Sequence, residues 1–265
     1  MRPLLRWAGS KRQLLPQLRA YWDASGCNRY VEPFAGSAAH FFDIEPRSAI
    51  INDTNEELIG FYRCMQTDAA AVFALADSWP IDDETYYDLR TLFRSERKVI
   101  RRSAMFFYLN RNCFNGIYRT NLSGYFNVPF GGSKTGSLPK WEEIESAVKL
   151  LASASLRCDD FESLLKREVR AGDFVYLDPP YAVENRRVFV QYSANTFGSA
   201  DLQRLSDLLH CIDALGATFL LSYAMAPEAR HFFAHWQSRR TSTQRNVAGF
   251  AHHRRRAMEM LVTNL

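Results

Sequence analysis

The sequence predicts an α/β fold, a mostly parallel sheet covered by helices and interrupted by a mainly helical segment. Short apolar stretches that end in small or acidic residues alternate with helical patterns, as in βαβ units. Residues 61–145 break this rhythm, because they read as mostly helical and then become rich in Gly, Asn and aromatic residues. We therefore expect 1–60 and 146–265 to form one domain and 61–145 to form a smaller, inserted domain.

The first part of the chain predicts two strands, each followed by a helix. A strand at 29–34 runs into Gly36 and a helix at 38–44. A second strand at 48–51 leads to Asp53. The next helix keeps its apolar residues on one face, namely Leu58, Phe61, Tyr62 and Met65.

The last part of the chain continues the alternation. A strand at 155–158 precedes a helix at 161–166, and a buried strand at 173–177 follows. A further helix is marked by the spacing of Leu202, Leu205, Leu208, Leu209, Ile212 and Leu215, and Gly216 can cap it. Strands at 217–223 and 258–263 complete the expected sheet.

Within the insert, Thr67-Asp68 and Asp82-Asp83 are expected to cap helices. Their short oxygen-bearing side chains accept hydrogen bonds from the free amides at a helix start. The stretch 94–119 holds seven basic residues and one acid, and 239–256 holds six arginines and no acid. Such stretches are typical of a surface that contacts phosphates, and equally of a solvated charged face.

Composition excludes several classes of protein. The 265 residues are 47% apolar and 23% charged, which is typical of a globular chain. The longest apolar run, 69–76, is far shorter than the roughly 20 residues of a membrane span. The five cysteines form no C-x-x-C pair, and the six histidines have no ligand partners at metal-binding spacing. We therefore expect a soluble, cytoplasmic protein without a membrane segment or a metal ion.

The tetrapeptide Asp178-Pro179-Pro180-Tyr181 carries the clearest chemistry. It follows a buried strand, at the sheet edge where ligands bind in open parallel sheets. A carboxylate beside a rigid backbone carbonyl can accept both protons of a planar amine, and the tyrosine ring can stack on the base. This arrangement suits alkylation of a poorly nucleophilic amino group. An ordinary Pro-Pro turn is the alternative.

A second candidate site is the turn after the first strand, which contains Pro33, Phe34, Ala35, Gly36 and Ser37. A glycine just past a strand lets a ligand approach the backbone closely. Asp53 ends the next strand, where α/β folds bind a ribose. Alone, the pattern is weak, because a glycine here also serves helix–sheet packing.

Together these motifs resemble the DNA adenine methylase (Dam) family of N6-adenine methyltransferases, over nearly the whole chain. The matches, in the family's order, are Arg6-Trp7-Ala8-Gly9-Ser10-Lys11-Arg12, Glu32-Pro33-Phe34-Ala35-Gly36-Ser37, Asn52-Asp53-Thr54-Asn55, the hairpin from Asn110 to Gly131, and Asp178-Pro179-Pro180-Tyr181. The resemblance implies a Rossmann-like class I methyltransferase sheet, an inserted target-recognition domain with a β-hairpin, and S-adenosylmethionine as the methyl donor.

The resemblance also implies roles for individual residues. Binding of S-adenosylmethionine is expected from Trp7, Ala8, Gly9, Lys11, Pro33, Phe34, Ala35, Gly36, Ser37, Asp53, Asp160, Phe161 and Asp178. Catalysis is expected from Asp178, Pro179, Pro180 and Tyr181. Contact with double-stranded DNA is expected from Arg111, Phe114, Asn115, Ile117, Arg119, Asn121 and Pro129, although Asn121 and Asn127 are more typical of turn formers.

The hairpin predicts how a base could be read. Phe114 can wedge into the stack that a flipped adenine leaves, and Arg119 can donate two hydrogen bonds to a guanine. Ile117 and Pro129 can contact a thymine methyl group. We therefore expect methylation in GATC or a related site beginning GA, by a monomer in a bacterium or by a phage enzyme in a bacterial host. A core aromatic and a surface ion pair are the alternative roles for Phe114 and Arg119.

Departures from the family pattern leave two other functions open. Ala38 and Ser10 stand where the family has glycine, and Tyr223 stands where it often has Asn. If residue 38 needs a positive φ, affinity for the methyl donor suffers. The alternatives are a weakly active or non-catalytic DNA-binding relative, and a methyltransferase acting on cytosine N4, on RNA or on a protein amide.

Overall fold

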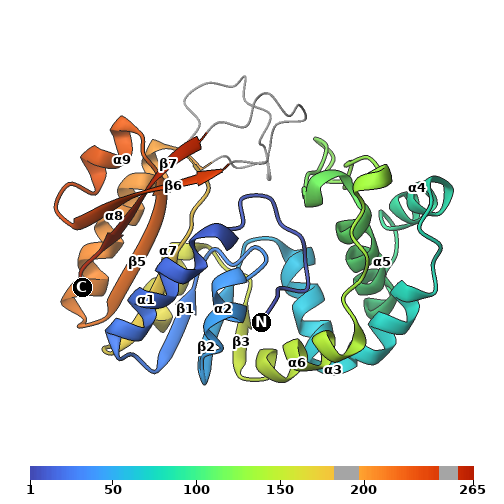
Figure 1. The fold of residues 1–265 in the computed structure, drawn as a ribbon, viewed down its shortest axis with the longest axis horizontal. Helices are drawn as coiled ribbons and strands as arrows, with labels where there is room; N and C mark the ends of the chain where they lie inside the picture. The colour runs from blue at the N-terminus through green and yellow to red at the C-terminus, as the bar shows by residue number, and fades with distance from the viewer. Residues whose placement is uncertain (182–196, 245–255) are drawn as a thin grey trace.

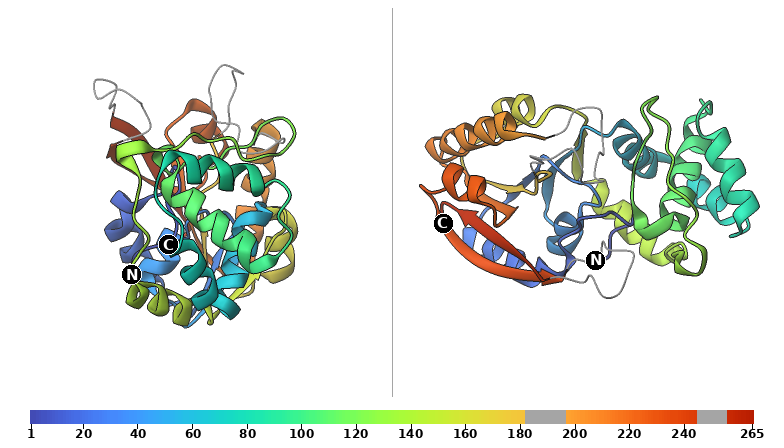
Figure 2. Two further views of the ribbon diagram at one scale, coloured as in Figure 1. Left: turned by 90° about the vertical axis from the view of Figure 1, so that its right-hand side faces the viewer. Right: turned by 90° about the horizontal axis from the view of Figure 1, so that it is seen from above.

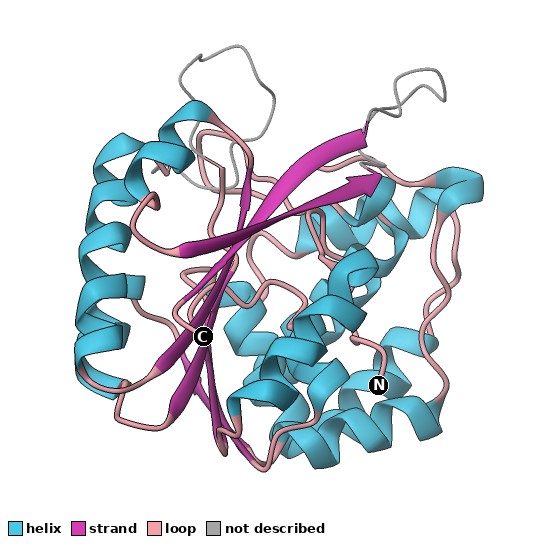
Figure 3. Cartoon of the chain, turned by 60° about the vertical axis from the view of Figure 1, so that its left-hand side comes forward, coloured by secondary structure: helices cyan, strands magenta, loops and turns pink. Residues whose placement is uncertain are grey.

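The computed structural model describes residues 1–181, 197–244 and 256–265 and centres on a seven-stranded sheet of order β3-β2-β1-β4-β5-β7-β6 (Figures 1 and 3). The strands are β1 (Arg29–Glu32), β2 (Ser48–Asn52), β3 (Ala154–Arg157), β4 (Asp173–Leu177), β5 (Thr218–Ala224), β6 (Gln237–Gln244) and β7 (Arg256–Thr263). The first five are parallel to one another, and β7 runs antiparallel to β5 and β6. The predicted α/β fold with a mostly parallel sheet is confirmed.

Both faces of the sheet are covered by hydrophobic clusters. Successive residues of a strand point to opposite faces, so alternate residues belong to different clusters. Phe174 and Tyr176 of β4 belong to one hydrophobic cluster, and Val175 and Leu177 belong to another. The first cluster includes residues of α1 (Leu15–Ser25) and α2 (Ala39–Ile44), and the second includes residues of α7 (Phe161–Glu168), α8 (Ser199–Ala214) and α9 (Pro227–Phe232). A short 3₁₀ turn, η1 (Arg12–Leu14), precedes α1.

The insert is mainly helical, as predicted. It comprises α3 (Glu56–Asp77), α4 (Asp83–Leu92), α5 (Val99–Asn112), η2 (Phe114–Gly116), η3 (Gly132–Lys134) and α6 (Trp141–Leu151). The helices α3, α4 and α5 lie together at one end of the molecule, away from β6 and β7 (Figures 1 and 2). The expected domain boundaries at 60/61 and 145/146 fall inside α3 and α6, and one buried cluster joins residues on both sides of them.

The two predicted helix caps have different outcomes. Asp82 caps α4, because its side chain accepts a hydrogen bond from the backbone N–H of Thr85 at 2.7 Å. At Thr67-Asp68 the predicted boundary coincides with a break, because two helical segments of α3 meet at Asp68, where φ is −133° and ψ is 29°. The Thr67 hydroxyl donates to the Cys64 carbonyl and to Asp68 Oδ2, so it does not form the predicted cap. Buried apolar residues on either side, up to Ala76, keep the helix docked across the kink.

Three elements were not predicted, namely α1, α9 and β6. Strand β6 reads as polar along its whole length, and Arg239 and Arg240 on it are exposed. Most of the basic stretch 239–256 lies outside the described residues. In the part of the chain that the structure describes, no helix is long and apolar enough to cross a membrane.

Candidate active site

The D-P-P-Y turn meets a lysine from the N-terminal segment. The Lys11 ammonium lies 2.8 Å from Asp178 Oδ1, and the Ser222 hydroxyl of β5 donates to the same oxygen at 3.2 Å. Lys11 is 8% exposed, whereas the Asp178 side chain is 20% exposed and can be reached by a ligand. Residues 167 positions apart in the sequence thus form one buried ion pair beside the rigid turn formed by Pro179 and Pro180.

Burial and charge act in opposite directions on this pair. The pKa of Asp178 is raised, because burial disfavours its charged form more than the neighbouring Lys11 favours it. The pKa of Lys11 is also raised: burial alone would lower it, but the negative charges of Asp178 and Glu259 outweigh that effect. Lys11 therefore stays protonated at neutral pH.

Tyr181 is held by contacts at its ring and at its hydroxyl. The ring packs edge-to-face on Tyr223 of β5, with 5.3 Å between centroids. The hydroxyl accepts a hydrogen bond from Lys11 at 3.1 Å and donates one to Glu259 Oε1 at 3.0 Å. Burial raises the pKa of Tyr181 to about 12, so the hydroxyl remains protonated at neutral pH. The sequence departure at Tyr223 therefore positions the predicted stacking ring.

Sequence reasoning missed Glu259, which lies on β7 and is buried. The sequence held a signal for it, because Glu259 is the single charged residue in the otherwise apolar stretch 258–262. An acid in the middle of a buried strand needs a partner. Ser222, also missed, carries no comparable signal, because a small hydroxyl residue is common in buried strands.

The turn after β1 is built around Gly36. Its φ of +48° suits glycine, and a Cβ there would lie 2.7 Å from Trp7 Cδ1. Its backbone N–H donates to Asp53 Oδ2 at 3.0 Å, and the N–H of Asn55 donates to Asp53 Oδ1 at the same distance. Ser37 contacts Ser10 through the two hydroxyls at 3.5 Å. The structure thus brings together three motifs that the sequence analysis singled out.

Ala38 has a positive φ, which is the strained backbone conformation for an alanine. Its φ and ψ are +50° and +39°, in the left-handed region, and it stands at the start of α2. For an L-residue this conformation costs about 1–2 kcal/mol. The surrounding turn holds it there, because the Ala38 N–H donates to the Ala35 carbonyl at 2.6 Å and Ala38 is fully buried.

Asn52, which the sequence analysis placed in a motif without assigning it a role, joins two loops of this edge. Its side-chain amide donates to the carbonyls of Pro33 and Asp159 at 2.9 and 3.0 Å, and its Oδ1 accepts from the Asp159 N–H at 2.9 Å. Asn52 is completely buried. The turn after β1 and the loop after β3 are therefore held at a constant separation.

The loop after β3 carries Asp160 and Phe161. The Phe161 ring lies 5.2 Å from the Phe34 ring, so two predicted cofactor residues are in contact. Asp160 already has two structural roles: its carboxylate caps α7 through the Glu162 N–H at 3.0 Å and pairs with Arg204 at 2.5 Å. The sequence prediction for Asp160 concerned only the cofactor.

The residues at this edge fit a cationic, adenosine-bearing methyl donor. Glu32, Asp53 and Asp178 follow or end neighbouring strands, and burial raises the pKa of each carboxyl. Glu32 Oε2 is buried and has no hydrogen-bond partner among the described residues. Negative charge and the Phe34–Phe161 aromatic pair are what a sulfonium and an adenine ring require. The N-terminal segment reaches the same edge, because Trp7 lies against Gly36 and Lys11 pairs with Asp178.

The hairpin region is held by isolated pairs. Antiparallel bridges join Cys113 to Phe130 and Thr120 to Phe126. Asn121 forms the tip, because its Oδ1 accepts from the backbone N–H groups of residues 123 and 125 at 3.0 and 2.9 Å. This agrees with its expected role as a turn former.

The predicted DNA-contacting residues differ in how they are held and in how exposed they are. Arg119 is oriented by Asn127, whose Oδ1 accepts from Arg119 Nε at 2.9 Å. Arg111 instead donates to backbone carbonyls of its own chain, at Ser137 and at Leu4. Along the hairpin, Pro129 is exposed, whereas Phe114, Asn115 and Ile117 are half-buried.

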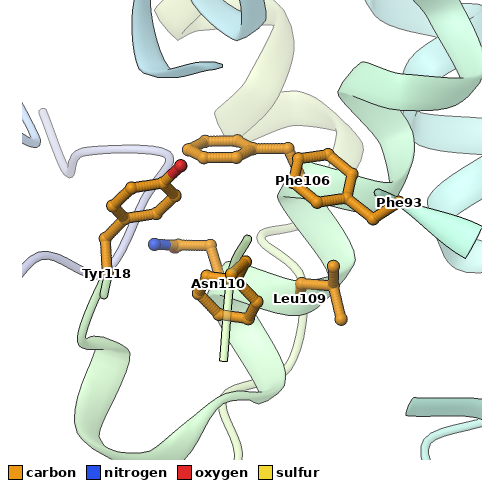
Figure 4. A pocket seen from close by; sticks show the side chains of 6 residues that line it. Phe93, Phe106, Leu109, Asn110 and Tyr118 are labelled. Carbon is orange, nitrogen blue, oxygen red and sulfur yellow. The ribbon is translucent and has the colours of Figure 1, made fainter. Parts of the chain in front are cut away.

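The N-terminal segment also docks against the hairpin. Arg6 and Asn110 exchange two hydrogen bonds, at 2.8 and 2.7 Å. The Trp7 indole stacks on Tyr118, with 5.6 Å between ring centroids and 13° between planes. Behind Tyr118 lies a hollow lined by six side chains, including Phe93, Phe106, Leu109 and Asn110 (Figure 4). Trp7 therefore touches both the Gly36 turn and the hairpin.

Several known proteins are similar in sequence to this chain over most of its length. The profile of D12 class N6 adenine-specific DNA methyltransferases matches residues 7–247. The type II methyltransferase M1.LlaDCHI of Lactococcus lactis is 34% identical, over 100% of this chain and 95% of the relative. The type II methyltransferase M.MjaIII of Methanocaldococcus jannaschii is 32% identical over 84% of each chain. The DNA adenine methylase of Serratia marcescens is 35% identical, over 79% of this chain and 78% of the relative. The chain belongs to the D12 class of N6 adenine-specific DNA methyltransferases.

Proposed function

We propose that the enzyme moves a methyl group from S-adenosylmethionine to N6 of an adenine flipped out of duplex DNA, and that Asp178 accepts a hydrogen bond from the reacting amine. The observation that supports this most directly is the reachable Asp178 carboxylate at the end of β4, oriented by Lys11 and Ser222. The methyl donor supplies an electrophilic carbon on a sulfonium.

The residues of the D-P-P-Y turn act on the amine. The N6 lone pair is delocalised into the purine ring, so the free amine is a poor nucleophile. Two acceptors, the Asp178 carboxylate and the Pro179 carbonyl, hold the N–H groups and favour the tetrahedral geometry of the transition state. The Tyr181 ring stacks on the flipped base. As the N–C bond forms, the bond between the methyl carbon and the donor sulfur would break, and the alkylated nitrogen would lose one proton, through the Asp178 carboxylate, to solvent.

The methyl donor is assigned to the edge formed by three loops. Asp53 holds the ribose hydroxyls of the methyl donor, and the Phe34–Phe161 pair covers its adenine ring. The Gly36 turn lies against the remainder of the donor. Trp7, Ala8, Gly9 and Lys11 complete this site from the N-terminal segment. The support is the Asp53 carboxyl held by the Gly36 N–H, the contact between the Phe34 and Phe161 rings, and the contact between Trp7 and the Gly36 turn.

Recognition of the DNA is assigned to the hairpin, at a GATC site or another site beginning GA. The terminal nitrogens of Arg119 have no hydrogen-bond partner among the described residues, so they are free to donate to guanine O6 and N7. Phe114 fills the gap left by the flipped adenine, while Ile117 and Pro129 contact a thymine methyl group. Asn115 is assigned to an adenine edge or the phosphate backbone.

Labelled S-adenosylmethionine and unmethylated duplex DNA test the reaction and the site. Digestion of the product is expected to yield N6-methyladenine, and sequencing is expected to place it in sites beginning GA. N4-methylcytosine would overturn the assigned chemistry, and a modified site without GA would overturn the assigned specificity. Asp178→Ala is expected to abolish transfer while the Kd for the methyl donor stays within about tenfold. Parallel loss of both would mean that Asp178 mainly shapes the cofactor site.

Arg119→Ala tests the recognition role separately. Loss of a bidentate guanine contact costs about 1–3 kcal/mol at one base position and leaves the other positions unchanged. The rates are measured on a set of duplexes, each with one substituted base pair. For the variant, substitution at one position should no longer change the rate, whereas substitution at the other positions should change it as in the wild type. A uniform loss across all duplexes would identify Arg119 as a phosphate contact.

A further inference from the structure

Glu259 is a buried acid in a strand that has no need of one for folding. On β7 it pairs in register with Ala224 of β5 and Thr241 of β6, and it is 3% exposed. Burying a carboxylate costs several kcal/mol unless it is paired or hydrogen-bonded. An apolar residue at this position would extend the apolar run of β7 without that cost.

Two groups of the active site supply the partners of Glu259. The Tyr181 hydroxyl donates to Oε1 at 3.0 Å, and the Lys11 ammonium lies 3.9 Å from Oε2. Tyr181 belongs to the D-P-P-Y turn, and Lys11 is the cation that pairs with Asp178. Glu259 therefore reaches the catalytic carboxylate through two neighbours that contact each other at 3.1 Å.

The chemistry of the hydroxyl sets the order of these hydrogen bonds. A tyrosine hydroxyl has one proton to donate and lone pairs that accept. Because Tyr181 donates to Glu259, its lone pairs are left to Lys11. Lys11, with three protons, can then serve Asp178 and Tyr181 while it remains close to Glu259. The Glu259 carboxylate thus orients the hydroxyl and keeps a second negative charge beside the ammonium.

We propose that Glu259 is a positioning residue for methyl transfer, acting through the Tyr181 hydroxyl and the Lys11 ammonium. It holds the tyrosine ring of the D-P-P-Y turn in place. It also gives Lys11 a second carboxylate, so Asp178 can take up the hydrogen bond of the incoming amine without leaving a buried ammonium unpaired. The inference rests on the proposed function, because it assigns Asp178 and Tyr181 to the target base.

A double-mutant cycle with Tyr181→Phe tests the proposal. Glu259→Ala is expected to lower kcat by about thirtyfold or more while the KM for DNA changes by less than about threefold. Glu259→Gln keeps an acceptor for the Tyr181 hydroxyl but loses the charge, so it should lower kcat by only about three- to tenfold. In the Tyr181→Phe background Glu259→Ala should cost clearly less than in the wild type, because the shared hydroxyl is gone.

Controls separate positioning from strand stability. Val262→Ala leaves a cavity in the core on the same strand, in register with Leu221 and Ser238 and away from the active site, so it should lower Tm without changing kcat. An equal loss from Glu259→Ala in both backgrounds, or an unchanged kcat, overturns the proposal. If Glu259→Ala does not fold, a wild-type kcat for Glu259→Gln overturns it instead. Absence of N6-methyladenine with the wild-type enzyme would refute the proposed function itself.

Discussion

Gly36→Ala is expected to destabilise the protein in two ways that can be measured apart. The residue has a φ of +48°, and an added Cβ would lie 2.7 Å from Cδ1 and 3.0 Å from Nε1 of Trp7. The first penalty is conformational and depends on the backbone alone. The second requires the Trp7 indole to move, and the indole stacks on Tyr118. Substitution in the turn after β1 should therefore also disturb the hairpin.

The magnitude follows from these contacts. A left-handed conformation costs an L-residue about 1–2 kcal/mol. Loss of the Trp7–Tyr118 stack costs about 0.5–1.5 kcal/mol more. The free energy of unfolding should therefore fall by about 1.5–3.5 kcal/mol, which corresponds to a decrease in Tm of about 3–14 °C in a chain of this size.

Gly172→Ala is the matched control, and thermal unfolding is the assay. Gly172 has a φ of +80°, but a Cβ there meets nothing within 4 Å, so only the conformational penalty applies. Gly36→Ala should lower Tm by more than Gly172→Ala, and the excess should disappear in a Trp7→Ala background. Equal decreases for the two glycines, or an excess that survives removal of the indole, would refute the assigned contact.

Three further substitutions probe the same sheet edge. Asn52→Ala removes three buried hydrogen bonds and should lower the free energy of unfolding by about 2–4 kcal/mol in urea titrations; a loss under about 1 kcal/mol would mean that the two loops do not depend on it. The rate should fall as the pH falls through the raised pKa of Asp178, because only the ionised carboxylate accepts a hydrogen bond from the amine. Lys11→Met removes the positive charge that opposes protonation of Asp178. The acid limb of the plot of kcat against pH should therefore move to higher pH. An unmoved limb would separate Lys11 from Asp178. Asp160→Ala should lower stability by about 0.5–2 kcal/mol through the lost cap, and calorimetry that finds unchanged affinity for the methyl donor would restrict Asp160 to that structural role.

The sheet and its motifs were predictable because their signals are local. A strand that is buried on both faces has a nearly continuous apolar sequence, which can be recognised without knowledge of the fold. Strand β4 is such a strand, so the sequence predicted both the strand and the position of Asp178 at its end. Strand β6 escaped prediction because it is exposed and polar, and β7, its neighbour in the sheet, supplies the pairing that its own sequence does not suggest. The signal at Thr67-Asp68 is also local, and it coincides with the kink at which the two segments of α3 meet.

The contacts within the site were less predictable, because they join residues that are distant in sequence. Lys11 was expected to bind the methyl donor, yet the structure pairs it with Asp178, and no pattern in either segment indicates that ion pair. Glu259 is 78 residues from Tyr181, and only its isolated charge in an apolar strand gave a clue. The φ of Ala38 depends on how the turn docks beneath α2, which the residue type alone does not reveal.

Four carboxyl groups gather at this end of the sheet: Glu32 and Glu259 are buried, Asp53 and Asp178 are partly buried, and Lys11 pairs with Asp178 and Glu259. Such an arrangement is unfavourable for folding, because burial of negative charge without compensation is costly and raises the pKa of the acids. It becomes favourable when a cation enters. The proposed methyl donor is a sulfonium, and it becomes neutral once the methyl group leaves. We therefore expect these carboxyl groups to favour the cationic donor over its neutral product, which would assist both binding of the donor and release of the product.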